Sequence, residues 1–211
     1  HFTGSKEHNV AMRSLALEKG MKMNEYGLFK GERLIPCKDE AEIFSRLGLN
    51  YIEPELRENM GEIAAACEGK LPQLVEVKDI RGVFHCHSTF SDGTASVEAM
   101  VNGAKALGFE FFGMADHSEV AIYAGGMTPE KIKKQFAEID ALNKKLKGIY
   151  IFKGMEADIL PDGEMDMGST ILSQFDYIVA SVHSKFNLPA KEMTARIIKA
   201  VKNKTVRILG H

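Results

Sequence analysis

Histidines and acidic residues in the second half of the sequence recur near the predicted carboxyl ends of strands. Seven residues share this placement: His85, His87, Asp92, His117, Glu156, His183 and His211. A single histidine after a strand is more often a hydrogen-bonded core or surface residue than a ligand, but a series of such strand ends is different. Imidazole and carboxylate groups together suit zinc, manganese or iron. The pattern therefore predicts a metal site.

The first two of these histidines lie on one predicted strand and are two residues apart. Because side chains alternate along a strand, both imidazoles should lie on one face and Cys86 on the other, where a buried structural thiol is expected. Asp92 follows in a loop made tight by Gly93. Asp158 either orients a ligand or is a solvated acid at a strand end.

Such a mixed cluster is suited to the hydrolysis of phosphate esters. Carboxylates that bridge let two or three ions lie close together. One ion generates hydroxide from water near neutral pH, and its neighbours neutralise the charge on the phosphate oxygens and the leaving alkoxide. The basic cluster Lys131, Lys133 and Lys134 is instead expected to be a solvated helix face.

The elements that must position these residues alternate between strands and helices. Strands are predicted at 83–87, 111–115, 150–155, 177–181 and 206–209, and the clearest helices at 129–147 and 190–203. Thr128 is the expected N-cap of the first of these helices, and Pro129 its first residue. Repeated strand-helix units predict a parallel sheet, open or closed into a barrel, with functional groups at the carboxyl ends of its strands.

The sequence before this pattern differs in character. A helix over 5–19, a hairpin around Gly31 and a short helix capped by Asp39 predict a compact α+β unit. The pattern changes near residue 75. We therefore divide the chain into a first domain at 1–59, a linker at 60–79 and a second domain at 80–211.

Composition excludes several classes of protein. The 211 residues are 45% hydrophobic and 27% charged, as in an ordinary folded protein. No apolar run approaches the roughly 20 residues that span a bilayer, so no membrane partner is expected and we place the chain in the cytoplasm. Cys37, Cys67 and Cys86 form no C-x-x-C pair. The net charge of -2 leaves nucleic-acid contact to a local patch or to bound metal ions.

The segment 85–93, together with Asp116-His117 and Glu156, resembles the polymerase and histidinol phosphatase (PHP) family. The resemblance implies a distorted seven-stranded, TIM-like βα barrel with up to three zinc, manganese or iron ions on nine ligands. The seven residues above match the first seven ligands. An Asp and a His from a late D-x-H motif have no counterpart in a sequence that stops at His211, so we expect an incomplete barrel and weak hydrolysis.

The resemblance also implies how the ions share their ligands. The first ion would lie on His85, His87 and Glu156, and the third on Asp92 and His117. The second ion would lie on Glu156, His183 and His211. Glu156 would thus bridge two ions.

The opening of the sequence resembles the thumb of family X DNA polymerases. The matching residues are Phe2-Thr3-Gly4-Ser5, Asn9, Arg13, Glu18-Lys19-Gly20 and Asn24-Glu25-Tyr26. The resemblance implies DNA contacts by Gly4, Ser5, Asn9 and Arg13, with the last two near the nascent base pair and the template. The polymerase palm has no counterpart here, so DNA repair synthesis would belong to a longer bacterial parent protein.

Three functions are compared on these grounds. The leading one is a metal-dependent 3'-5' exonuclease or related DNA phosphoesterase acting on the 3' end of a primer-template duplex. The second is a small-molecule phosphatase of the histidinol phosphatase type, which needs no thumb. The third is a non-catalytic DNA-binding or structural module, which the seven retained ligands disfavour. The sequence does not define an oligomeric state.

Overall fold

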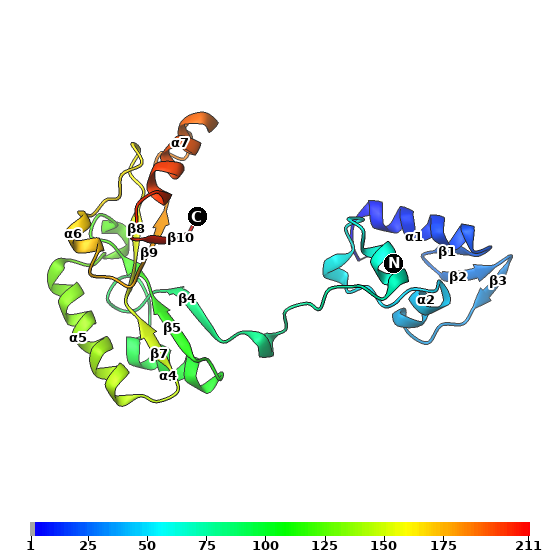
Figure 1. Cartoon of the computed structure of the whole chain (residues 1–211), viewed down its shortest axis with the longest axis horizontal. Coiled ribbons are helices and arrows are strands. Elements are labelled where there is room, and N and C mark those ends of the chain that lie inside the picture. Colours follow the sequence, from blue (N-terminus) through cyan, green and yellow to red (C-terminus); the bar gives the residue numbers. More distant parts are fainter. Residues whose placement is uncertain (1–2) are drawn as a thin grey trace. The chain divides into compact units, whose positions relative to one another are not determined.

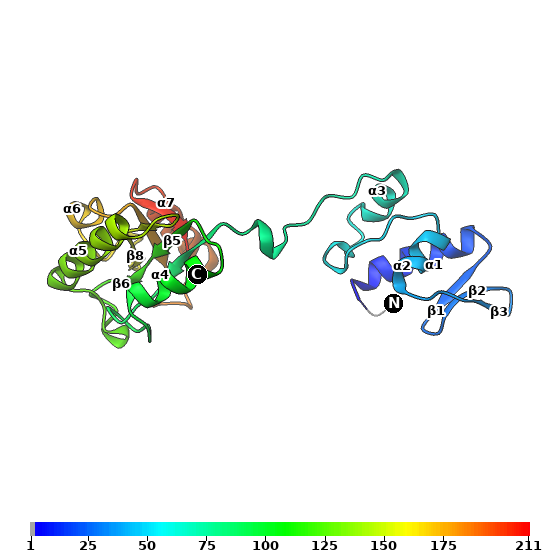
Figure 2. The same ribbon diagram turned by 90° about the horizontal axis from the view of Figure 1, so that it is seen from below.

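The computed structural model describes residues 3–211, so Phe2 of the expected thumb turn lies outside the described residues. The chain forms two compact units, His1–Leu74 and Val75–His211. Figures 1 and 2 show both units. None of the helices in the described part of the chain is long and apolar enough to cross a membrane.

The first unit combines helices with a small antiparallel sheet. Its elements are α1 (Lys6–Glu18), β1 (Lys22–Asn24), β2 (Gly27–Lys30), β3 (Arg33–Ile35), α2 (Glu40–Arg46) and α3 (Glu62–Glu68). Ser5 begins α1 by accepting a hydrogen bond from the backbone N–H of His8, and Asp39 begins α2 by accepting one from Glu42. The helix, the hairpin and the short helix that the sequence predicts are thus all present.

The core of this unit extends beyond the first 59 residues. Buried apolar side chains from α1, β2 and α2 meet Ala66 of α3. At the other end of α3, the Glu62 carboxylate lies 2.6 Å from Nδ1 of the buried His8. Residues 62–68 were expected to belong to the linker. Their apolar face and this buried polar pair instead pack α3 onto the first unit.

A buried arginine organises the end of this unit. The Arg57 guanidinium donates hydrogen bonds to the backbone carbonyl of Ile52 and to both carboxylate oxygens of Glu40. Tyr51 also donates to Glu40, at 2.9 Å. The hydrogen bond from Arg57 is the main cause that lowers the pKa of Glu40 to about 2. The ionised carboxylate of Glu40 is therefore the form that stabilises this cluster.

We expect Glu40→Gln to reduce the acid sensitivity of the first unit. The pKa of Glu40 is depressed in the folded chain, so its stabilisation is present above its ordinary pKa of 4.5 and is lost as the pH falls toward about 2. Urea unfolding followed by NMR signals of Leu28 at pH 6 and pH 3 would measure this. Glu32→Gln, at an exposed position, is the control, and equal pH dependence in both variants would contradict the prediction.

The second unit contains two parallel sheets. One has the order β4 (Gly82–Cys86), β5 (Phe111–Met114), β7 (Tyr150–Phe152), and the other the order β10 (Val206–Leu209), β9 (Tyr177–Ser181), β8 (Gly154–Asp158), β6 (Asp116–His117). Every pairing within them is parallel, as predicted. Single residues, Ala115 and Lys153, separate β5 from β6 and β7 from β8. The described strands close no ring, because β4 and β10, each at the edge of its sheet, do not pair with each other.

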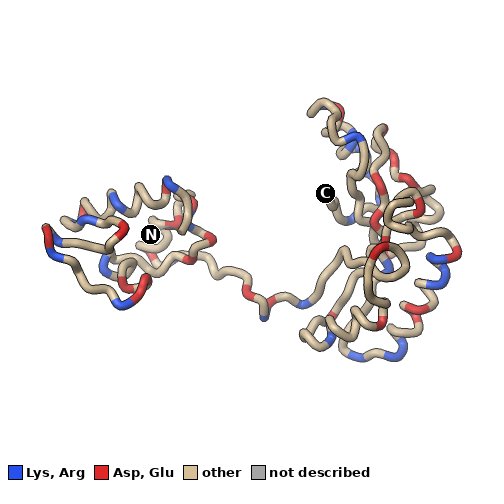
Figure 3. Tube along the Cα trace, turned by 180° about the vertical axis from the view of Figure 1, so that it is seen from behind, with Lys and Arg blue, Asp and Glu red and all other residues tan. Residues whose placement is uncertain are grey.

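Helices cover these sheets and bury two apolar clusters. The helices are α4 (Val97–Ala106), α5 (Pro129–Lys145), α6 (Ser169–Leu172) and α7 (Ala190–Val201). Ile139 and Leu142 of α5 pack with α4 against the first sheet, whereas Ile132 joins the cluster beneath the second. Thr128 caps α5 as expected. Basic and acidic residues are interspersed along both units (Figure 3), in keeping with the small net charge.

Candidate metal centre

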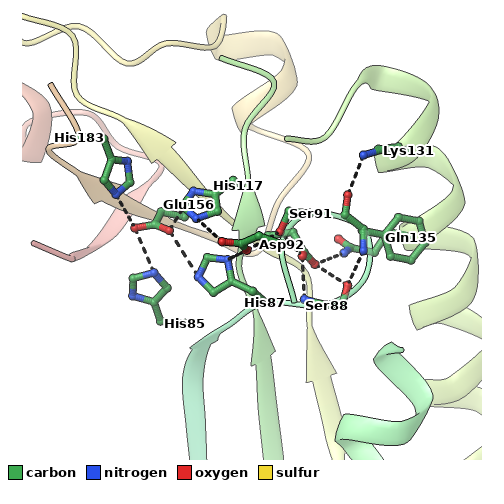
Figure 4. Close-up of polar contacts among 12 residues, drawn as sticks. His85, His87, Ser88, Ser91, Asp92, His117, Lys131, Gln135, Glu156 and His183 are labelled. Atoms are coloured by element: carbon green, nitrogen blue, oxygen red, sulfur yellow. Dashed lines mark hydrogen bonds and ion pairs between the residues drawn. The ribbon is translucent and has the colours of Figure 1, made fainter. Parts of the chain in front are cut away.

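The carboxylate of Glu156 is the centre of the candidate site. Glu156 lies on β8, which is buried along its whole length, and its side chain is 1% exposed. Figure 4 shows imidazoles directed at it from several strand ends. Five ring nitrogens lie near its two oxygens: His85 Nε2 at 3.1 Å, His87 Nε2 at 3.4 Å, His117 Nδ1 at 3.2 Å, His183 Nε2 at 3.5 Å and His211 Nε2 at 3.2 Å.

A second carboxylate, that of Asp92, extends the cluster. Its oxygens lie 3.4 Å from His87 Nδ1 and 3.6 Å from His117 Nε2. All seven sequence-predicted residues are therefore brought together, although the His211 side chain is 64% exposed. His87 and His117 each face both carboxylates, so their two ring nitrogens link the two parts of the cluster.

Three sets of ligand atoms lie close enough together to hold an ion. Within each set the atoms are within 4.8 Å of one another; the sets are His85, Glu156 and His211; His87, Asp92 and His117; and His117, Glu156 and His183. Glu156 belongs to two sets, as expected for a bridging carboxylate. The sharing differs from the expected scheme, because His87 groups with Asp92 and His117 rather than with His85.

The chemistry of these donors fits divalent cations. Among the described residues, Glu156 Oε1, His87 Nδ1 and His117 Nδ1 are buried atoms that make no hydrogen bond, which is costly unless another partner satisfies them. Burial and the neighbouring His117 lower the pKa of His87, which favours the neutral ring that binds metals. Burial opposes ionisation of Glu156, yet the nearby Ser181 hydroxyl and the imidazoles of His85 and His117 keep its pKa below the ordinary value.

The backbone at His85 differs from the expected regular alternation. The register between β4 and β5 shifts between Val83 and Cys86, and His85 has a φ of 63°. This left-handed conformation is uncommon for a residue other than glycine. His85 and His87 still converge on Glu156, but through a local irregularity of β4 and not through simple period-two alternation. The half-buried Cys86 packs against the apolar cluster under α4 and α5, as expected for a structural thiol.

Asp116 organises the loop that carries Asp92, a role that the sequence interpretation missed. Its buried carboxylate accepts hydrogen bonds from the Ser88 backbone and hydroxyl at 2.7 and 2.8 Å, from Ser91 at 2.6 Å and from Gln135 at 2.6 Å. The only signal in the sequence was its position beside His117. The Gln135 contact arises from α5, which no local pattern connects to this loop.

Lys131 has a different role from the one expected of a solvated basic cluster. Its ammonium group donates to the carbonyl of Phe90 at 2.9 Å and to that of Gly125 at 2.6 Å. The two loops that follow β4 and β6 are thereby held to the start of α5. The contact with Phe90 joins segments 41 residues apart, whereas Gly125 lies only six residues before Lys131.

Asp158 and Arg196 fix the loops on the other side of the centre. Asp158 Oδ1 lies 2.7 Å from His183 Nδ1, so the opposite ring nitrogen is directed at Glu156. The buried Arg196 of α7 donates to the backbone carbonyls of Ser184, Leu160 and Ile159. These carbonyls lie just beyond β8 and His183, so one guanidinium connects both loops.

The expected DNA contacts lie at the start of the first unit. Gly4 has a φ of 87°, and a Cβ there would collide with Arg57, so this position requires glycine. The Asn9 amide donates to the carbonyl of Ser5 at 2.9 Å, and Arg13 is exposed one turn further along α1. Gly4, Ser5 and Asn9 therefore have structural roles in the helix start, whether or not DNA is bound.

We predict that Asp158→Ala weakens metal binding by about 10- to 100-fold, the usual effect of removing a partner that orients a ligating histidine. Asp158→Asn keeps an acceptor for the N–H of His183 and should recover most of the affinity. Metal content after dialysis against graded chelator concentrations would measure both variants. Equal metal retention by the alanine variant and the unmodified chain would show that Asp158 does not orient His183.

Comparison with known protein families assigns each part of the chain to a family. The model of the PHP domain family matches residues 84–207, and the model of the DNA polymerase beta thumb matches residues 1–58. The chain therefore belongs to the PHP domain family. Its PHP domain is joined to a thumb of the family X polymerase type, as the resemblance of the sequence had implied.

Curated relatives match either the whole chain or a part of it. The chain is 39% identical over its whole length to "DNA polymerase/3'-5' exonuclease PolX" of Bacillus subtilis, of which it spans 37%. It is 47% identical over 57 residues to "DNA polymerase IV" of Saccharomyces cerevisiae, covering 27% of this chain and 10% of that protein. A "Probable phosphatase" of Caldicellulosiruptor saccharolyticus is 30% identical over 133 residues, covering 60% of this chain and 52% of that protein.

Proposed function

We propose that the second unit is a metal-dependent DNA phosphoesterase that removes nucleotides from 3' ends, within a bacterial family X DNA polymerase of the repair type. The observation that carries the proposal is the buried Glu156 carboxylate, which five imidazoles approach from separate strand ends. The relative from Bacillus subtilis, whose name includes both activities, supports the same assignment.

The seven clustered residues would hold divalent cations, with zinc or manganese favoured and iron an option, up to three in the complete domain. Bound cations would supply Lewis acidity to activate water near neutral pH and to neutralise charge on the phosphate. Glu156 presents its two oxygens to different imidazoles and would bridge two ions. Burial lowers the pKa of His87, which favours its neutral ring, and Asp158 contacts the ring nitrogen of His183 that faces away from Glu156.

We extend the proposal to the barrel and to the DNA partner. The two parallel sheets would be parts of a distorted PHP barrel, with the catalytic groups at the carboxyl ends of its strands. The thumb would hold primer-template DNA, with Gly4, Ser5, Asn9 and Arg13 at its contact surface. The match of the first 58 residues to the polymerase thumb supports this part.

A small-molecule phosphatase is the alternative. Two relatives described as probable phosphatases match 133 residues, 60% of this chain, over about half of their own length. The same metal site would serve either substrate. The thumb favours DNA, since a small phosphate ester would not require it.

Hydrolysis of 3'-labelled primer, compared with hydrolysis of a phosphomonoester, should distinguish the two functions. We expect manganese-dependent shortening of the labelled DNA that chelator abolishes. Cleavage of the monoester at a rate far above that of the DNA would favour the alternative. An absence of metal-dependent cleavage of both substrates would contradict the hydrolase assignment.

Glu156→Gln should lower metal content and DNA hydrolysis together, by at least about 10-fold in affinity, because the substitution removes the charge that two sets of ligands share. Inductively coupled plasma analysis and primer degradation can be performed on the same preparation. Glu164→Gln is the matched control, since that exposed glutamate pairs with Lys199 outside the cluster. Unchanged metal content and full activity in the Glu156 variant would remove this residue from the site.

A further inference from the structure

The loop between β6 and α5 carries an exposed aromatic ring at the edge of the metal centre. The centroid of the Tyr123 ring lies 6.0 Å from that of His117 and 6.2 Å from that of His183, with the rings edge to face. The Tyr123 side chain is nevertheless 70% exposed. One part of the ring thus contacts the ligand cluster while a large part remains open to solvent.

The loop itself is firmly held. Met127 donates a backbone hydrogen bond to the carbonyl of His117 at 2.8 Å, and Lys131 holds the carbonyl of Gly125. Ala121 and Ala124, on either side of the exposed pair Ile122 and Tyr123, are buried. A Cβ on Gly126 would collide with the backbone of Ser118. The loop therefore presents these two side chains from a fixed backbone.

The exposed side chains contribute little to the core. Ile122 is 86% exposed and Val120 is 52% exposed, so three neighbouring apolar or aromatic positions face water beside a charged cluster. Such an arrangement is unfavourable for the free protein and is typical of a ligand-binding surface. A suitable ligand must combine an anionic group for the cluster with a flat apolar group for the ring.

We propose that Tyr123 is the stacking platform for the nucleobase of the 3'-terminal nucleotide, with Ile122 extending the apolar surface. The proposal rests on the function proposed above. A phosphodiester at the centre is joined to a base through a single ribose, which brings that base to the ring adjacent to His117 and His183. Aromatic side chains bind bases of any sequence in this way.

The test compares a single-stranded oligonucleotide that has a normal 3'-terminal base with one that ends in an abasic nucleotide. Stacking on one aromatic ring is expected to lower KM for the base-bearing end by roughly 5- to 100-fold. Tyr123→Ala should bring the ratio of the two KM values close to one, and Tyr123→Phe should retain it. Tyr123→Leu keeps the bulk of the side chain without an aromatic face and should behave like the alanine variant.

Tyr150→Ala is the matched control, because Tyr150 is a half-exposed tyrosine at the start of β7. Metal content is measured for every variant. A ratio that persists in Tyr123→Ala or Tyr123→Leu with normal metal content would overturn the proposal. Loss of the ratio in both variants, with its retention in Tyr123→Phe and Tyr150→Ala, would support it.

A binding measurement separates this proposal from the proposed function. Fluorescence of a 3'-terminal 2-aminopurine falls when the base stacks, and no cleavage is needed to observe it. Quenching that requires an aromatic residue at position 123 supports the stacking platform even if no DNA is hydrolysed, in which case only the hydrolase assignment fails. Equal quenching by the unmodified chain and by Tyr123→Leu would overturn the platform whatever the cleavage result.

Discussion

The buried carboxylate of Glu156 is the constraint on which the second unit depends. An ionised group taken out of water is costly unless charged or hydrogen-bonding partners surround it. Here the partners are imidazoles, and no single strand could supply five of them. They come from the region of β4, from β6 and from the residues after β9 and β10. Parallel strands with aligned carboxyl ends meet this demand, because every strand then ends at the same edge.

The order of the strands also brings ligands close to Glu156. In the second sheet β8 lies between β9 and β6, and His117 is directly paired in register with Glu156. His85 lies on β4, and the remaining ligands lie beyond the strand ends, on segments that have more freedom. Polar side chains restrain these segments. Asp116 and Lys131 hold the loops after β4 and β6, while Asp158 and Arg196 hold those after β8 and β9. The restraining residues thus do as much for the geometry as the ligands do.

Sequence was a good guide where periodicity and chain order decide the structure. The strand ends that carry His117, Glu156 and His183 follow from alternating strands and helices, and the loop made tight by Gly93 indicated Asp92. Sequence could not reveal contacts that join distant segments, such as Gln135 to Asp116 or Arg196 to the carbonyl of Ser184. It also missed the irregularity at His85, since period-two alternation assumes a regular strand. Helix α3 was assigned to the linker because its short apolar face has meaning only against the core of the first unit.

In the metal-free chain, the candidate site lowers the stability of the fold. A left-handed backbone at His85 costs roughly 1 to 2 kcal/mol, and the buried atoms Glu156 Oε1, His87 Nδ1 and His117 Nδ1 add to the cost as long as they are unsatisfied. Cations that bind these atoms in the folded chain alone would offset those terms, so binding of metal and completion of the fold are linked. The apolar clusters beneath the sheets keep the cluster assembled, and the centre can then retain unsatisfied ligands without collapse of the strands that carry them.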